Sequence, residues 1–111
     1  MIHHSAELAE RWRTMPLVEQ LANVGSEVSR MTKWRGRDDA IAERAFERML
    51  ELLDLTMACV PGPERLREIA RAREQLVGAW LSDLPASDPE WDSLNRYFLY
   101  FAVLARKQQS A

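Results

Sequence analysis

The chain has 111 residues, which is enough for one domain with a buried core but not for several domains. Its content of 47% hydrophobic and 29% charged residues is typical of a globular protein and argues against a disordered one. The formal net charge of -2 excludes a general attraction to nucleic acid or anionic membranes, and the single cysteine, Cys59, excludes an internal disulfide.

The sequence contains no segment that suits a membrane. The longest hydrophobic run, residues 98–105, has eight residues, whereas a transmembrane helix needs roughly 20. The first residues also lack the long apolar core of a signal peptide. We therefore expect a cytoplasmic protein without membrane association.

Proline, glycine and capping residues divide the chain into four main helices. We expect these helices at about residues 16–35, 38–59, 64–81 and 88–107, preceded by a segment, residues 1–15, that forms either a loose arm or a short extra helix. Pro16 and Pro89 suit first helical turns, and Gly36 suits a helix end. No stretch alternates with period two, so we expect no strands. The sequence predicts an all-α fold, an antiparallel four-helix bundle formed by residues 1–111 as one domain.

The apolar faces of these helices indicate how they pack. In the first main helix a small-residue stripe, Ala22, Gly25 and Ser29, runs beside the apolar seam. Because a helical glycine costs about 1 kcal/mol relative to alanine, we expect another helix to approach closely at Gly25. In the third main helix the large apolar residues predict a core face that lies around Arg73. That predicted face consists of Leu66, Ile69, Val77 and Trp80.

The stretch "KWRGRDD", residues 33–39, has two interpretations. Cations favour a helix C-terminus and aspartate favours a helix N-terminus, so the corner between two helices accounts for every residue type in it. The alternative is a corner that also binds an anion or a nucleic-acid phosphate, with a tryptophan on which a base could stack. The candidate anion-binding residues are Lys33, Trp34, Arg35 and Arg37.

Arg73 interrupts the apolar face predicted for the third main helix. A buried guanidinium must meet an acid or extend to solvent, and the acids that flank the neighbouring apolar faces are Glu27, Glu43, Glu47 and Asp54. We favour a structural salt-bridge network in which Arg73 makes a buried or half-buried pair with Glu27, Glu47 or Asp54. The alternatives are a pocket for a carboxylate or phosphate anchored by Arg73, and an arginine that only reaches solvent.

Catalytic patterns are mostly missing from the sequence. Its histidines, His3 and His4, lie at the N-terminus, far from any partner for a nucleophile or a zinc cluster. The motif "ELLD", with Glu51 and Asp54, resembles one half of the magnesium site of MazG-type nucleotide pyrophosphohydrolases, but "QLAN" and "EVSR" stand where the other half belongs. HEPN ribonucleases need a histidine shortly after an arginine, and none follows here. We expect no enzyme, no catalytic residue, no metal site and no cofactor.

Two further stretches carry a resemblance at the level of fold. "LANVGSEVSR" and "AFERMLELLDLT" together resemble small, uncharacterised bacterial four-helix-bundle proteins. This resemblance implies a helical bundle from a bacterium and no particular activity.

The last helix carries more apolar surface than a bundle needs. In "FLYFAVLA", residues 98–105, one stripe is enough for the core, so Leu99, Tyr100 and Val103 point elsewhere. We expect these residues to form an oligomer interface, with a dimer favoured, unless the N-terminal segment covers them. The sequence therefore predicts a non-catalytic interaction protein with a possible protein partner. The alternatives are a nucleic-acid or nucleotide binder that uses the basic corner and, with less support, a MazG-like enzyme.

Overall fold

The computed structural model of the chain describes residues 6–110, and every regular element in this range is a helix. The predicted all-helical class is confirmed. The helix bounds lie within three residues of the predicted ones, and the N-terminal segment contributes a short helix. The five helices are α1 (Ala6–Thr14), α2 (Leu17–Trp34), α3 (Asp39–Cys59), α4 (Pro63–Leu81) and α5 (Pro89–Ser110).

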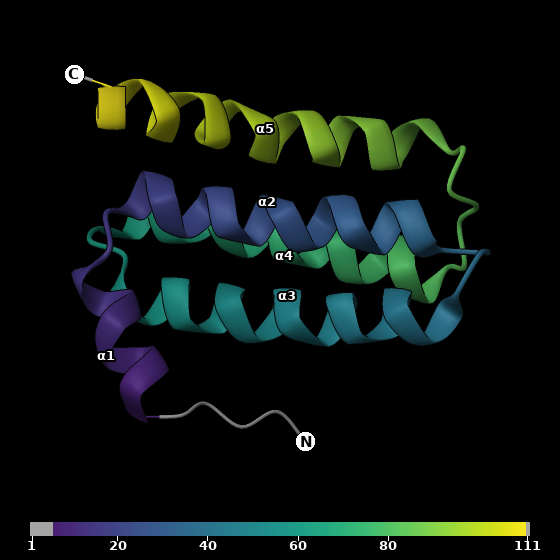
Figure 1. Ribbon diagram of the computed structural model, residues 1–111, viewed down its shortest axis with the longest axis horizontal. Coiled ribbons are helices and arrows are strands. Elements are labelled where there is room, and N and C mark those ends of the chain that lie inside the picture. The colour runs from purple at the N-terminus through teal and green to yellow at the C-terminus, as the bar shows by residue number, and fades with distance from the viewer. Residues whose placement is uncertain (1–5, 111) are drawn as a thin grey trace.

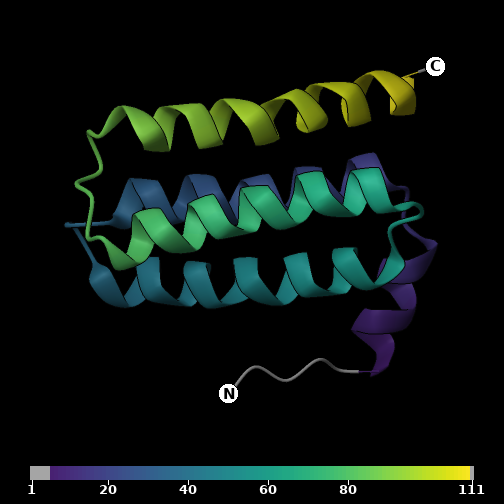
Figure 2. The same cartoon turned by 180° about the vertical axis from the view of Figure 1, so that it is seen from behind.

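The four long helices lie side by side, and each runs opposite to the one before it (Figures 1 and 2). The backbone of α2 lies closest to α3 and α5, while α4 contacts the same two helices at a wider spacing. The short helix α1 turns aside at one end of the bundle and packs against α3. The bundle therefore has a tight side around α2 and a wider side around α4.

The helix ends follow from local chemistry. The side chain of Asp38 accepts a hydrogen bond of 3.2 Å from the backbone N–H of Ile41 and so caps α3. Gly36, between α2 and α3, has a φ of +83°, a conformation in which a Cβ is unfavourable. Asp39 accepts a hydrogen bond from the N–H of Gly36. These contacts give glycine and both aspartates of the "KWRGRDD" stretch a structural role.

The close approach expected at Gly25 is confirmed. A Cβ built on Gly25 would lie 2.8 Å from the Cβ of Phe98 on α5, which is closer than two such atoms can pack. Ala22 and Ser29 lie on the same side of α2 and leave the same space open. The small-residue stripe therefore sets the short distance between α2 and α5.

The core face predicted for α4 was wrong in its centre. The residues that face the core are Ile69, Ala72, Leu76 and Ala79, whereas Leu66 is exposed. Trp80 lies at the edge of this face, where its ring stacks on Phe46 of α3 with centroids 4.6 Å apart. The large ring of Trp80 fits between α3 and α4, whereas small residues such as Ala72 and Ala79 face the centre of the bundle. Because the prediction relied on the largest apolar residues, it assigned α4 the wrong rotation about its axis.

Candidate functional site

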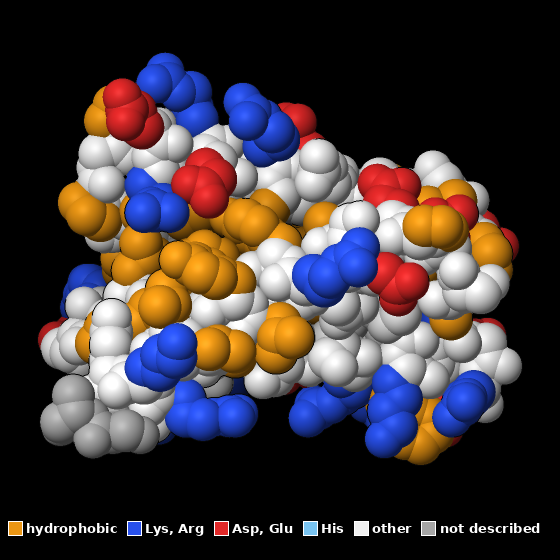
Figure 3. Space-filling model, turned by 90° about the horizontal axis from the view of Figure 1, so that it is seen from above, with side chains coloured by type: hydrophobic (Ala, Val, Ile, Leu, Met, Phe, Trp, Pro, Cys, Tyr) orange, Lys and Arg blue, Asp and Glu red, His pale blue; other side chains and the backbone are white. Residues whose placement is uncertain are grey.

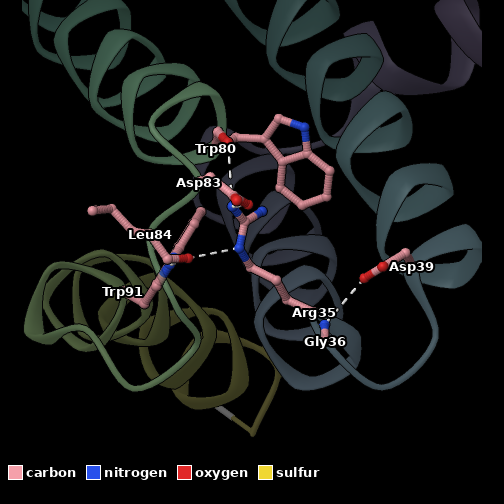
Figure 4. Close-up of polar contacts among 7 residues, drawn as sticks. All are labelled: Arg35, Gly36, Asp39, Trp80, Asp83, Leu84 and Trp91. Carbon is pink, nitrogen blue, oxygen red and sulfur yellow. Dashed lines mark hydrogen bonds and ion pairs between the residues drawn. The ribbon is translucent and has the colours of Figure 1, made fainter.

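Arg35, the central cation of the predicted anion-binding corner, is directed into the protein. Its side chain is 11% exposed, and its Nε donates a hydrogen bond of 2.7 Å to the backbone oxygen of Leu84. One terminal nitrogen donates to the oxygen of Trp80 at 3.3 Å and to the carboxylate of Asp83 at 3.0 Å. Figure 4 shows this guanidinium reaching from the end of α2 to the α4–α5 loop. Arg35 therefore fastens the loop to the corner.

Aromatic rings strengthen this position of Arg35. The guanidinium carbon lies 4.6 Å from the centroid of the Trp80 ring and 5.6 Å from that of Trp91, and such cation–π contacts are favourable. Lys33 lies over the ring of its neighbour Trp34, with its Nζ 5.5 Å from the centroid, and Arg37 is exposed. The four candidates Lys33, Trp34, Arg35 and Arg37 therefore do not form one cationic surface. Arg35 is hydrogen-bonded inside the protein, whereas Lys33 and Arg37 are exposed.

The salt-bridge network predicted around Arg73 is reduced to one ion pair at the surface. The Nε of Arg73 lies 3.2 Å from the carboxylate of Asp54, and the two side chains are 34% and 48% exposed. Glu27 pairs instead with Arg30 on its own helix, and Glu47 is exposed. The predicted pairing of Arg73 with Asp54 is thus observed, but Glu27 and Glu47 do not join it, because α4 turns Ala72 and Leu76 to the core and leaves Arg73 at the α3–α4 edge.

The two acids of the half-motif lie in different surroundings, since Glu51 is buried and Asp54 is exposed. The sequence suggests that Glu51 turns away from the apolar face, yet it is buried and forms an ion pair with Arg48. Thr56 on the same helix is also buried, and it accepts a hydrogen bond of 2.9 Å from Trp12 of α1. Within residues 6–110, no group of three or more His, Cys, Asp or Glu residues lies in a position to hold a metal ion.

Sequence reasoning missed a polar contact between α4 and α5. The hydroxyl of Tyr97 donates a hydrogen bond of 2.8 Å to the carboxylate of Glu68, which also accepts one from Arg65. Burial raises the pKa of Tyr97 well above its usual value, and the hydrogen bond to Glu68 and its negative charge raise it further. In the sequence, the place of Tyr97 next to the core residue Phe98 could have indicated that its side chain is partly buried. It could not have identified Glu68 as the hydrogen-bond acceptor.

The largest exposed apolar feature of α5 is a surface that we call the α5 patch, formed by Leu99, Tyr100 and Val103. Their exposed fractions are 58%, 60% and 41%. Figure 3, a view onto α5, shows hydrophobic side chains gathered at the left of the molecule, over the C-terminal half of this helix. The predicted interface residues are thus brought together at the surface.

A groove runs beside the α5 patch, between α2 and α5. It has a volume of about 630 Å³, and the α2 side chains that line it are small. Leu99 belongs to both the groove wall and the α5 patch. The lining residues are Ala22, Gly25, Ser26 and Ser29 from α2, and Asp92, Asn95, Arg96, Phe98, Leu99 and Ala102 from α5.

The short helix α1 does not cover the α5 patch. Leu8 and Trp12 are buried in the core, and α1 packs against α3. Gln20 of α2 holds the end of α1 by donating hydrogen bonds of 2.7 Å to the oxygen of Trp12 and 3.1 Å to that of Met15. For residues 6–14, the alternative in which the N-terminal segment covers α5 within one chain is therefore wrong.

Comparison of the chain with models of known families, with curated proteins and with solved structures finds no match in any of the three. Among the helices of residues 6–110, none combines the length and the apolar character that crossing a membrane requires. The function is therefore inferred from the arrangement of the side chains.

Proposed function

We propose that this protein is a non-catalytic helical-bundle interaction protein that self-associates, most simply as a dimer, through the α5 patch. The observation that carries the proposal is the exposure of three large apolar side chains, Leu99, Tyr100 and Val103, on adjacent turns of one helix. Contiguous exposed apolar surface marks interfaces, and a closed two-fold dimer is the commonest way to cover it.

The α5 patch is not needed for the packing of its own bundle. The opposite side of α5 supplies the core with Trp91, Leu94, Phe98, Phe101 and Ala105, all of which are buried. A helix at the outside of a bundle is stable with one apolar stripe. The second apolar surface is therefore best explained by a contact with another molecule.

The alternatives predicted from the sequence have less support. A nucleic-acid binder that uses the corner would need its cations directed outward, and Arg35 is directed inward to Leu84. A MazG-like enzyme would need acids in place of Gln20 and Asn23, where "QLAN" stands. A bacterial source, a cytoplasmic location and an additional protein partner stay predictions from the sequence.

Sedimentation equilibrium at micromolar concentration tests the proposal. We expect a mass near twice the 12.8 kDa of one chain, and dissociation when Tyr100→Glu or Val103→Glu places a charge in the interface. The matched control is Leu81→Glu, because Leu81 is 75% exposed at the end of α4, away from the α5 patch. A wild-type mass near 12.8 kDa, or equal dissociation by the control, would overturn the proposal.

A further inference from the structure

We infer that the occupant of the α5 patch is the α5 helix of a second copy, docked antiparallel about a two-fold axis that passes between Leu99 and Tyr100. This inference rests on the self-association proposed above and adds the partner surface, the direction and the register. It comes from the order of charges along the outer face of α5.

The outer face of α5 is one stripe with three chemically different parts. At 100° per residue, the direction opposite the buried Leu94 and Phe98 carries Asp92, Arg96, Val103 and Lys107, with Leu99 and Tyr100 at its two edges. All six side chains are exposed. The stripe thus begins with an acid and ends with a base, and between them lie Arg96 and then the α5 patch.

The two end charges of the stripe, Asp92 and Lys107, are placed symmetrically about the α5 patch and are opposite in sign. Asp92 precedes Leu99 by seven residues, and Lys107 follows Tyr100 by seven residues. An antiparallel second copy centred between Leu99 and Tyr100 therefore places each Asp92 opposite Lys107 of the other copy. A parallel copy places Asp92 against Asp92 and Lys107 against Lys107, and like charges across an interface are unfavourable.

The residues between the centre and the ends are compatible with this register. Arg96 precedes Leu99 by three residues and Val103 follows Tyr100 by three, so the same axis places Arg96 opposite Val103 of the second copy. The methylene stem of an arginine can cover an apolar side chain while its guanidinium remains in water. The Arg96 positions therefore form part of the polar rim.

The surface of α2 next to the patch leaves room for a second copy. The α2 residues that line the groove beside α5 are Ala22, Gly25, Ser26 and Ser29, so no large side chain rises along that edge. Leu99 stands on the groove wall, where a side chain from the second copy can reach it. The outer face of α5 is accordingly the prominent surface on this side of the bundle.

Charge exchange tests the direction of pairing. We expect Asp92→Lys and Lys107→Asp each to weaken the dimer about tenfold, because two opposed pairs change from attraction to repulsion. The double variant should recover the wild-type dissociation constant to within about twofold, because it restores both pairs. Glu90→Lys is the matched control, since Glu90 lies in the same first turn of α5 but off the stripe; it should leave the dimer unchanged. Single variants without effect, or a double variant as weak as either single one, would overturn the inference.

Disulfide trapping tests the register in a Cys59→Ser background. A disulfide needs Cα atoms roughly 4.4–6.8 Å apart. The proposed axis brings position 100 of one chain close to position 100 of the other, so Tyr100→Cys should form a disulfide-linked homodimer. Asp92→Cys should cross-link only when mixed with Lys107→Cys. Self-linking of Asp92→Cys alone overturns the antiparallel arrangement. A wild-type dimer in which none of these variants cross-links also overturns the inference but leaves self-association standing, whereas a monomeric wild type overturns the proposed function itself.

Discussion

The two sides of the bundle hold their helices together in different ways. On the side of α2, the contact with α5 is made by small residues, and Gly25 lies against the Cβ of Phe98. On the side of α4, wider spaces are filled by aromatic rings, such as the stacked pair Phe46 and Trp80, and are closed at the edge by polar pairs. Side-chain volume therefore sets the helix spacing, and each side should respond differently to substitution.

The largest expected effect is on the tight side. Gly25→Leu adds a side chain where even a Cβ would lie 2.8 Å from Phe98, so α5 must move outward. We expect a loss of about 3 kcal/mol in the free energy of unfolding, at the upper end of the range for overpacked sites. Urea denaturation measures it. A loss below about 1 kcal/mol would show that the α2–α5 contact yields easily, contrary to the comparison.

The second prediction concerns the loop that joins α4 to α5. Arg35→Met keeps an unbranched stem between Trp80 and Trp91 but removes the hydrogen bonds to the oxygens of Leu84 and Trp80. We expect a loss of about 2 kcal/mol, because charged donors to partly buried acceptors contribute more than neutral ones. Thermal unfolding provides the measurement. The exposed Arg37, replaced in the same way, is the control and should change stability little.

The third prediction tests the polar edge between α4 and α5. Tyr97→Phe removes the hydroxyl that donates to Glu68 and should cost about 1 kcal/mol at neutral pH. The same change at the exposed Tyr100 should cost close to nothing. Chemical denaturation of both variants makes the comparison, and equal losses would mean that the Glu68 contact does not stabilise the wider side.

The raised pKa of Tyr97 adds a pH dependence with a definite sign. The pKa of the Tyr97 phenol is higher in the folded protein than in the unfolded chain. The contribution of Tyr97 to the free energy of unfolding is therefore fully present below the unfolded pKa of about 10. It decreases as the pH rises above that value. We expect the stability of the wild type to fall more steeply than that of Tyr97→Phe above about pH 10, and parallel curves would contradict this.

Sequence periodicity was sufficient for the helical class but not for the rotation of every helix. The seam of α2 is clear because Leu17, Leu21, Val24, Val28 and Met31 repeat with bundle spacing, and all except the partly buried Leu17 are fully buried. In α4 the core positions include Ala72 and Ala79, which carry little hydrophobic signal, so the large residues around Arg73 misled the prediction. The partner of Trp80 is Phe46 of α3, which stacks on it from a different helix and which the pattern of α4 alone does not reveal.

In the candidate site, too, one feature could be predicted from the sequence and another could not. The α5 patch was predictable because "FLYFAVLA" has no charge on any side of the helix for two turns. The inward position of Arg35 was not, because its acceptors, the backbone oxygens of Trp80 and Leu84, are more than 40 residues away in the chain. Backbone acceptors in a loop leave no mark in the residue types that a sequence displays.

The smallest expected effect completes the comparison from the wider side. Gly78 on α4 is a helical glycine like Gly25, but a Cβ built on it meets nothing within 4 Å. Gly78→Ala should therefore stabilise the protein by about 0.5–1 kcal/mol, because alanine restricts the unfolded chain and suits a helix better than glycine. The matched change Gly25→Ala gains the same propensity but meets Phe98, so we expect it to destabilise. Differential scanning calorimetry of the two alanine variants gives the sign of each change in stability. Opposite shifts in melting temperature support a tight side and a wide side of the bundle. Stabilisation of both variants would show that α2 and α5 separate at little cost.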